Sequence, residues 1–185
     1  RNRLRGYYYN HLCPQPSPVE TGTNSTKPLV SVIIPIYNHA EYIQKCIQSV
    51  LDQSYDNFEL ILVDDASPDP EVKSILKSFA DTPGCHVLFN EKNLGISETQ
   101  NRGLYQARGT HIAFLDCDDY LASDALETML SMWKLDTCYA YSDRIYVDPD
   151  DREVSRVSFV ELPRKDYFQE QLDGKMYTSH LKIIH

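Results

Sequence analysis

Three carboxylates lie within four positions directly after an apolar run. Residues 112–115 read Ile-Ala-Phe-Leu, the composition of a buried strand, and Asp116, Asp118 and Asp119 follow at once. Carboxylates this close repel one another, so a cation among them would stabilise them, and a divalent metal ion is the simplest candidate. The alternative is a solvated acidic turn that caps the next helix. The run by itself does not distinguish these two interpretations.

The segments that must position these carboxylates alternate between strand and helix patterns. Apolar, β-branched runs predict strands at residues 29–34, 58–63, 86–89 and 112–115, with Pro35 ending the first. Apolar residues at helical spacing predict helices at 43–51, 70–79, 97–107 and 123–133. Asp69 before Pro70, Ser97 with Gln100, and Ser123 are the predicted helix starts.

This alternation predicts the fold class. Near-continuous apolar strands between amphipathic helices indicate a mostly parallel sheet covered on both faces, which is a three-layer α/β/α sandwich. Residues 138–147 have the composition of one or two further strands. Beyond residue 148 the pattern weakens, and only residues 157–162 and 176–184 resemble strands.

Polar or aromatic residues follow each of the four predicted parallel strands. They are Pro35, Tyr37 and Asn38, then Asp64, Asp65 and Ser67, then Asn90, Asn93 and Gly95, and finally Asp116, Asp118 and Asp119. Ligands of open parallel sheets bind beyond the carboxyl ends of the strands. A merely solvated edge would not gather Asp pairs with so few Lys or Arg, so the pattern favours a metal-dependent site. Structural roles remain open for single residues: Asp65 as a turn cap, Gly95 at positive φ, and Cys117 as a small spacer.

Composition limits the function classes. The chain has 185 residues, 42% hydrophobic content and a net charge of -9, which indicates a globular protein and argues against a nucleic-acid-binding surface. Five cysteines without CxxC spacing favour a reducing compartment. The sequence has neither an apolar run of membrane-spanning length nor a signal peptide, so we expect a cytoplasmic location, with the inner face of the membrane as an alternative.

Domain organisation follows from the same sequence. Residues 1–28 contain four prolines and a polar stretch, which predicts an N-terminal arm or linker before a domain at residues 29–185. Because the chain does not begin with Met, we expect a piece of a longer protein with further domains and an incomplete C-terminal part.

Four motifs in order resemble one known family. Residues 32–38 (Val-Ile-Ile-Pro-Ile-Tyr-Asn), 53–67, 93–103 and 109–121 are similar to the four sequence blocks of family 2 glycosyltransferases with the GT-A fold, the last being their DxD block. The resemblance covers residues 29–148. One DxD alone is a weak signal, but four blocks at the expected spacing are specific.

The resemblance implies a donor site for a nucleoside-diphosphate sugar, usually UDP-linked. By similarity, the nucleotide-sugar-binding residues are Pro35, Tyr37, Asp65, Asn93, Asp116 and Cys117. Asp118 and Asp119 would hold Mg²⁺ or Mn²⁺ against the diphosphate, with His180 as a candidate third ligand. The acceptor would be a hydroxyl of a saccharide such as a growing polysaccharide, or of a lipid or protein, and transfer would invert the anomeric centre.

The catalytic base is not identified. In the family it follows a segment that residues 179–184 resemble, so we expect it beyond His185. A phosphoacceptor receiver domain is disfavoured because its acidic pair should follow the first strand. A sugar nucleotidyltransferase is disfavoured because no Gly-rich basic loop follows Ile34. A non-catalytic nucleotide-sugar-binding or scaffold domain derived from a transferase remains open.

Overall fold

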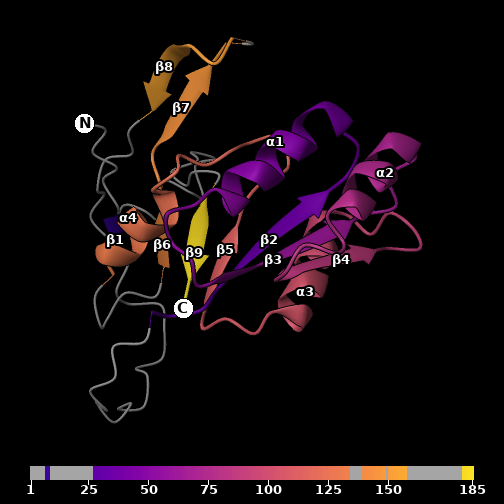
Figure 1. Ribbon diagram of the computed structural model, residues 1–185, viewed down its shortest axis with the longest axis horizontal. Coiled ribbons are helices and arrows are strands. Elements are labelled where there is room, and N and C mark those ends of the chain that lie inside the picture. Colours follow the sequence, from indigo (N-terminus) through magenta and orange to yellow (C-terminus); the bar gives the residue numbers. More distant parts are fainter. Residues whose placement is uncertain (1–6, 9–26, 134–138, 149, 158–180) are drawn as a thin grey trace, which may run out of the picture.

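The computed structural model describes residues 7–8, 27–133, 139–148, 150–157 and 181–185 (Figure 1). Its strands are β1 (Tyr7–Tyr8), β2 (Val30–Ile36), β3 (Phe58–Asp64), β4 (Cys85–Phe89), β5 (His111–Phe114), β6 (Tyr139–Tyr141), β7 (Arg144–Val147), β8 (Glu153–Val157) and β9 (Lys182–Ile184). Its helices are α1 (Ala40–Leu51), α2 (Pro70–Ser78), α3 (Ile96–Gln106) and α4 (Ala125–Ser131).

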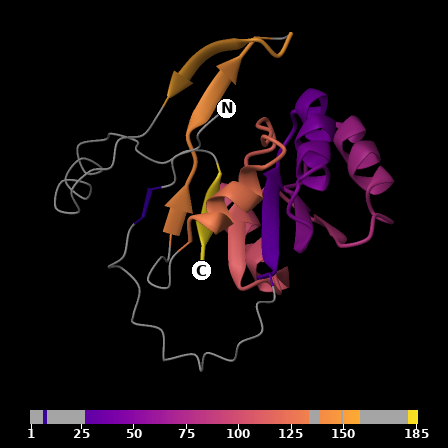
Figure 2. The same ribbon diagram turned by 60° about the vertical axis from the view of Figure 1, so that its left-hand side comes forward.

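A seven-stranded sheet in the order β1-β6-β9-β5-β2-β3-β4 forms the centre of the molecule. The strands β5, β2, β3 and β4 run parallel, whereas β9 pairs antiparallel with both β5 and β6. β7 and β8 form a separate antiparallel hairpin that stands away from this sheet in Figures 1 and 2. No helix in the described ranges combines the length and apolar character that a membrane span requires.

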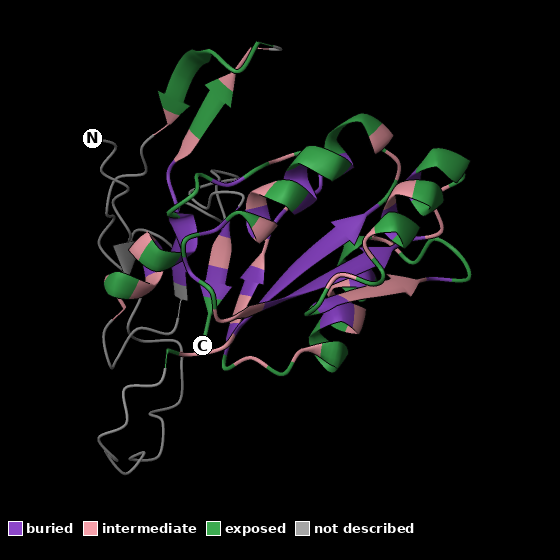
Figure 3. Ribbon diagram, in the orientation of Figure 1, coloured by how far each residue is buried: buried purple, intermediate pink, exposed green. Residues whose placement is uncertain are grey.

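The two faces of the sheet carry cores of different size. Alternate residues of β2 and β3 point to opposite sides, so Val32 and Leu60 join a large core with the buried faces of α1, α2 and α4. On the other side, Ile33 and Ile61 pack in a smaller cluster, and α3 covers this face (Figure 3). The predicted three-layer α/β/α sandwich with a mostly parallel sheet is therefore confirmed.

Three details of the predicted elements were wrong. Pro35 does not end the first strand, because β2 continues to Ile36. Strand alternation turns the nitrogen of Pro35 toward β5, whose pairing with β2 has already ended at Ile33, so no ladder hydrogen bond is lost. Ser97 and Ser123 do not cap helices: Gly95 and Asp124 occupy those N-cap positions. The predicted cap at Asp69 is confirmed, since its side chain accepts a hydrogen bond from the backbone N–H of Glu71.

The predicted N-terminal arm contains one described element. Tyr7 and Tyr8 form β1, which pairs with β6 at the edge of the sheet, so part of the segment belongs to the sheet rather than to a linker. Residues 1–6 and 9–26 lie outside the described residues, and the boundary at residue 29 stays a prediction. The same holds for the strands expected at 158–162 and 176–180.

A buried carboxylate joins β3 to β2 and to the loop before β5, at the amino ends of the parallel strands. Glu59 is 2% exposed, and its side chain accepts hydrogen bonds from Ser31 Oγ (2.6 Å), Arg108 N (2.6 Å) and Arg108 Nε (2.9 Å). His86 Nε2 lies 3.0 Å from the Arg108 guanidinium. Burial favours a higher pKa for Glu59, but the hydrogen bonds from Ser31 and Arg108 outweigh it and hold the pKa below its usual value.

His111 makes folding sensitive to mild acid. Its ring lies 4.8 Å from the rings of both Trp133 and His185 and is almost entirely buried. Burial, followed by the charge of His185, lowers its pKa from 6.5 to about 4. The unfolded chain therefore binds the proton first. The contribution of neutral His111 to the free energy of unfolding is complete above the pKa that this residue has in the unfolded chain. It is lost as the pH falls from 6.5 toward 4.

We expect the free energy of unfolding to fall by about 1–2 kcal/mol through His111 between pH 7 and pH 5. Urea unfolding at both pH values, on the wild type and on His111→Gln, measures this contribution. The variant should lose that part of the pH dependence. An equal loss of stability in both proteins would mean that another group is responsible.

Candidate functional site

The strand order brings four loops to one edge of the sheet. β2 lies between β5 and β3, and β4 follows β3, so the loops after β5, β2, β3 and β4 are neighbours in that order. This is the carboxyl edge of a parallel sheet, where the order of connection reverses beside the first strand. The polar residues predicted to gather there do so.

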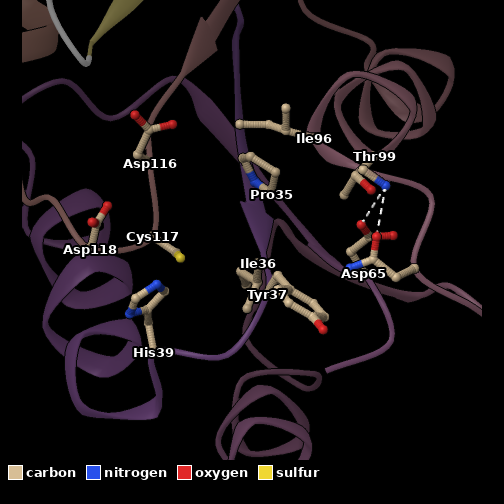
Figure 4. Close-up of a pocket in the computed structure, with 12 residues that line it drawn as sticks. Pro35, Ile36, Tyr37, His39, Asp65, Ile96, Thr99, Asp116, Cys117 and Asp118 are labelled. Atoms are coloured by element: carbon tan, nitrogen blue, oxygen red, sulfur yellow. Dashed lines mark hydrogen bonds between the residues drawn. The ribbon is translucent and has the colours of Figure 1, made fainter. Parts of the chain in front are cut away.

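A cavity of about 330 Å³ opens at this edge, a size typical of small-molecule sites. Its lining comes from all four loops and from the start of α3: Pro35, Ile36, Tyr37, His39, Asp65, Asn93, Gly95, Ile96, Thr99, Asp116, Cys117 and Asp118. Figure 4 shows Asp116 and Asp118 on one side, Asp65 and Thr99 on the other, and Pro35, Ile36 and Tyr37 between them. The Tyr37 side chain is 44% exposed, so its ring stands open to an incoming ligand.

Asp65 organises the wall formed by the loop before α3. Its Oδ1 accepts hydrogen bonds from Asn90 Nδ2 (2.7 Å) and Leu94 N (2.8 Å), and its Oδ2 accepts one from Gly95 N (2.9 Å). Burial alone would raise its pKa. The hydrogen bonds, led by that of Leu94, hold the pKa below the usual value, so the carboxylate is charged at neutral pH. Where the sequence predicted a capping box from Ser97, Asp65 instead satisfies the backbone N–H of Gly95, the N-cap residue of α3.

The loop between β2 and α1 is held in an unusual backbone conformation. Asn38 and His39 both have positive φ, 62° and 63°, which costs about 1 kcal/mol or more for each non-glycine residue. The loop after β3 supports it: Asn38 N donates to Ser67 Oγ (2.9 Å), and Ser67 N donates to Asp64 Oδ1 (3.1 Å). The two loops thus fix each other and the direction of Tyr37.

Two buried cysteines pack at the acidic loop after β5, which carries Asp116, Asp118 and Asp119. Cys117 is 8% exposed, and Cys46 Sγ on α1 lies 3.5 Å from the backbone oxygen of Asp116. Burial raises the pKa of the Cys46 thiol, and it raises that of Cys117 to about 11. Both are therefore neutral packing groups at physiological pH, which agrees with Cys117 as a small spacer between Asp116 and Asp118, both of which line the first cavity.

A second cavity of about 360 Å³ lies on the other side of the acidic loop. Asp118 lines both cavities, whereas Asp119 lines only the second. The remaining lining residues are Leu115, Tyr120, Leu121, Ala122, Ala125, Ser142, Asp143, Arg144, Ile145, Tyr146, Val147 and Leu181. The acidic loop, the hairpin strand β7 and α4 thus enclose a space that meets the first cavity at Asp118.

Within the ranges that the structure describes, no three His, Cys, Asp or Glu side chains are grouped so as to hold a metal ion. His180, the candidate third ligand, lies outside the described residues. Asp118 and Asp119 are therefore the described candidates for a metal, and their role stays a prediction.

The predicted site residues are brought together, although their binding roles remain predictions. Pro35, Tyr37, Asp65, Asn93, Asp116, Cys117 and Asp118 all line the first cavity. Sequence reasoning missed Ile36, His39, Ile96 and Thr99, and it expected Gly95 only as a turn residue. Ile96 and Thr99 are three apart on α3, a spacing that could have assigned them to one helix face. Arg102 has a structural role, since its guanidinium donates to the Phe89 carbonyl (2.8 Å) at the end of β4.

Comparison with known proteins gives a consistent result. A family model described as glycosyl transferase family 2 matches residues 31–183. Chondroitin synthase of Escherichia coli is 30% identical over 168 residues, which are 90% of this chain and 24% of that protein. The crystal structure of S. aureus TarS 1-349 in complex with UDP-GlcNAc is 31% identical with a TM-score of 0.52, covering 55% of this chain and 30% of that one.

A more distant structure supports the fold alone. The mannosyltransferase PcManGT from Pyrobaculum calidifontis, in complex with GDP-Man and Mn²⁺, is 23% identical with a TM-score of 0.57, covering 86% of this chain and 45% of that one. The chain spans less than half the length of the curated relatives that match it, from 17% to 44% in three of them.

Proposed function

Because the chain belongs to glycosyl transferase family 2, we propose that it transfers a sugar from a UDP-linked donor to a hydroxyl group of a saccharide acceptor. The observation that carries this proposal is the cavity at the carboxyl edge, with Pro35 and Tyr37 on one wall and Asp116 and Asp118 on another. The UDP-GlcNAc bound by TarS supports a UDP-linked donor, and the similarity to chondroitin synthase supports a saccharide acceptor.

The residues present fit a divalent cation bound together with the donor. Mg²⁺ is usually held by one or two carboxylates, several waters and substrate phosphates rather than by a complete protein cage. Asp118, exposed at the cavity mouth with Asp119 beside it, can supply such carboxylates without a third protein ligand. When bound, the metal would neutralise the charge that develops on the departing diphosphate.

The chain's own residues would orient the two substrates. We assign the donor nucleotide to the first cavity, where the Tyr37 ring can pack against the base, and the acceptor to the second cavity. An acceptor hydroxyl there would approach the sugar past Asp118, which borders both spaces. In-line attack with inversion requires a carboxylate base within hydrogen-bond reach of the hydroxyl, and we assign that role to no described residue.

A panel of nucleotide sugars tests the donor assignment. We expect UDP and at least one UDP-sugar to raise the melting temperature with Mn²⁺ or Mg²⁺ present, and to have little effect after EDTA treatment. GDP-mannose and ADP-glucose serve as comparison ligands. Equal stabilisation with and without metal would refute metal-dependent binding, and a preference for another nucleotide would refute the UDP assignment.

A non-catalytic role is the second candidate, because no base is assigned. A domain that only binds the nucleotide sugar would show the same stabilisation but no release of UDP with any saccharide acceptor. Measuring UDP release by the full-length protein, with and without acceptor oligosaccharides, separates the two functions.

We also propose a cytoplasmic location or the inner face of the membrane, which cell fractionation would test.

A further inference from the structure

Three side chains from distant parts of the sequence meet beside the second cavity. The Lys45 Nζ on α1 lies 3.9 Å from the centre of the Tyr120 ring and forms an ion pair with Asp151 in the turn between β7 and β8. The Tyr120 hydroxyl donates a hydrogen bond to Asp151 Oδ1 (3.2 Å). Tyr120 directly follows Asp119, so the acidic loop, α1 and the hairpin are joined at one point.

The hairpin lies largely exposed to solvent. Among the described residues, β7 and β8 pair only with each other, and every position of the two strands except Arg144, Val147 and Val157 is exposed. A two-stranded hairpin by itself is at best marginally stable in water. Its turn is ordered by Asp148, whose Oδ1 accepts from Asp150 N and Arg152 N, both at 2.9 Å. That order presents Asp151, at a φ of 61°, to Lys45.

We propose that Lys45, Asp151 and Tyr120 form a clamp that positions the hairpin beside the second cavity and couples it to the loop carrying Asp118. The assignment of that cavity to the saccharide acceptor rests on the proposed function. When the donor and the metal hold the acidic loop in one conformation, Tyr120 and its contacts with Lys45 and Asp151 also restrict the motion of the hairpin. Donor binding therefore orders the side of the site that receives the acceptor. The three residues are positioning residues, because they act through the hairpin and the loop.

Hydrogen exchange of the β7 and β8 amides, with UDP and Mn²⁺ as the probe, tests the clamp. Exposed ion pairs and cation–π contacts are individually weak, so in the ligand-free protein we expect Lys45→Met to speed hairpin exchange about fivefold. UDP with Mn²⁺ should slow hairpin exchange in the wild type and much less in the variant. Coupling between two sites is reciprocal. The Kd for UDP should therefore be higher in the variant, by the same factor by which the slowing of hairpin exchange by UDP is reduced.

Matched variants separate the clamp from general destabilisation. Lys45→Arg keeps the charge and the contact with the ring, and should restore slow exchange. Asp151→Asn suits the left-handed turn and still accepts from Tyr120, but loses the ion pair, and should give an intermediate rate. Gln44→Met, a neighbouring exposed position on α1, should behave as wild type.

Wild-type exchange of the hairpin in ligand-free Lys45→Met would overturn the clamp. Equal protection by UDP and Mn²⁺ in wild type and Lys45→Met would overturn its coupling to the acidic loop. If calorimetry finds no binding of UDP to the wild type, the donor assignment and the coupling both fail, while the ligand-free comparison still decides whether the clamp holds the hairpin.

Discussion

Replacing Asp118 by Asn should weaken metal-dependent UDP binding by about 100-fold or more. Even outer-shell partners of a bound metal are worth about 10- to 100-fold in affinity, and a direct carboxylate ligand is worth at least as much. The substitution keeps the size of the side chain and removes its charge. Since Asp118 is exposed, the melting temperature of the ligand-free protein should not change. Calorimetric titration of UDP at fixed Mn²⁺ measures the loss.

Two variants make this result specific. Asp124→Asn changes an exposed carboxylate just before α4 that lines neither cavity, and should bind UDP as the wild type does. Asp119→Asn should weaken binding as well if that residue shares the metal, but should leave the first cavity unchanged because it does not line it. Wild-type UDP affinity in Asp118→Asn would refute the assignment of Asp118 to the metal.

Replacing Glu59 by Ala should lower the free energy of unfolding by about 3–5 kcal/mol. The change leaves Ser31 Oγ and the backbone N–H of Arg108 without their acceptor, removes the partner of the Arg108 guanidinium, and opens a cavity. Equilibrium unfolding in urea at pH 7 measures the loss. Because Glu59 lies at the amino ends of the strands, UDP affinity of the remaining folded protein should not change.

Acid unfolding distinguishes the charge of Glu59 from its packing. Its pKa in the folded protein lies below the ordinary 4.5, so the folded state favours the ionised form. The stabilisation is fully present above the unfolded pKa and is lost as the pH falls through the folded pKa. Glu59→Gln keeps the shape and should lose this acid dependence below about pH 4.5. Glu91→Ala, at an exposed position, is the control. A loss of unfolding free energy in this variant equal to that in Glu59→Ala would point to a non-specific effect.

The sequence determined the order of elements and the chemistry of the site. Buried strands with period-two faces and helices with period-3.6 faces were visible because each element must bury an apolar surface. Asp69 before Pro70 marked a helix start because capping is a local interaction, complete within three residues. The positions of Tyr37, Asp65, Asn93 and Asp118 after successive strands predicted a shared edge, since parallel strands end on the same side of a sheet.

Tertiary structure decided the interactions between residues far apart in the chain. Asp65 accepts the backbone N–H of Gly95, the N-cap residue of α3, across thirty positions, so the local Ser97 pattern was misleading. β9 enters the sheet between β5 and β6, which no periodicity within its three residues could indicate. Lys45 meets Asp151 across 106 positions. A sequence pattern reports what each segment must bury, whereas the partner of a polar group depends on which segments the packed sheet brings within hydrogen-bond distance.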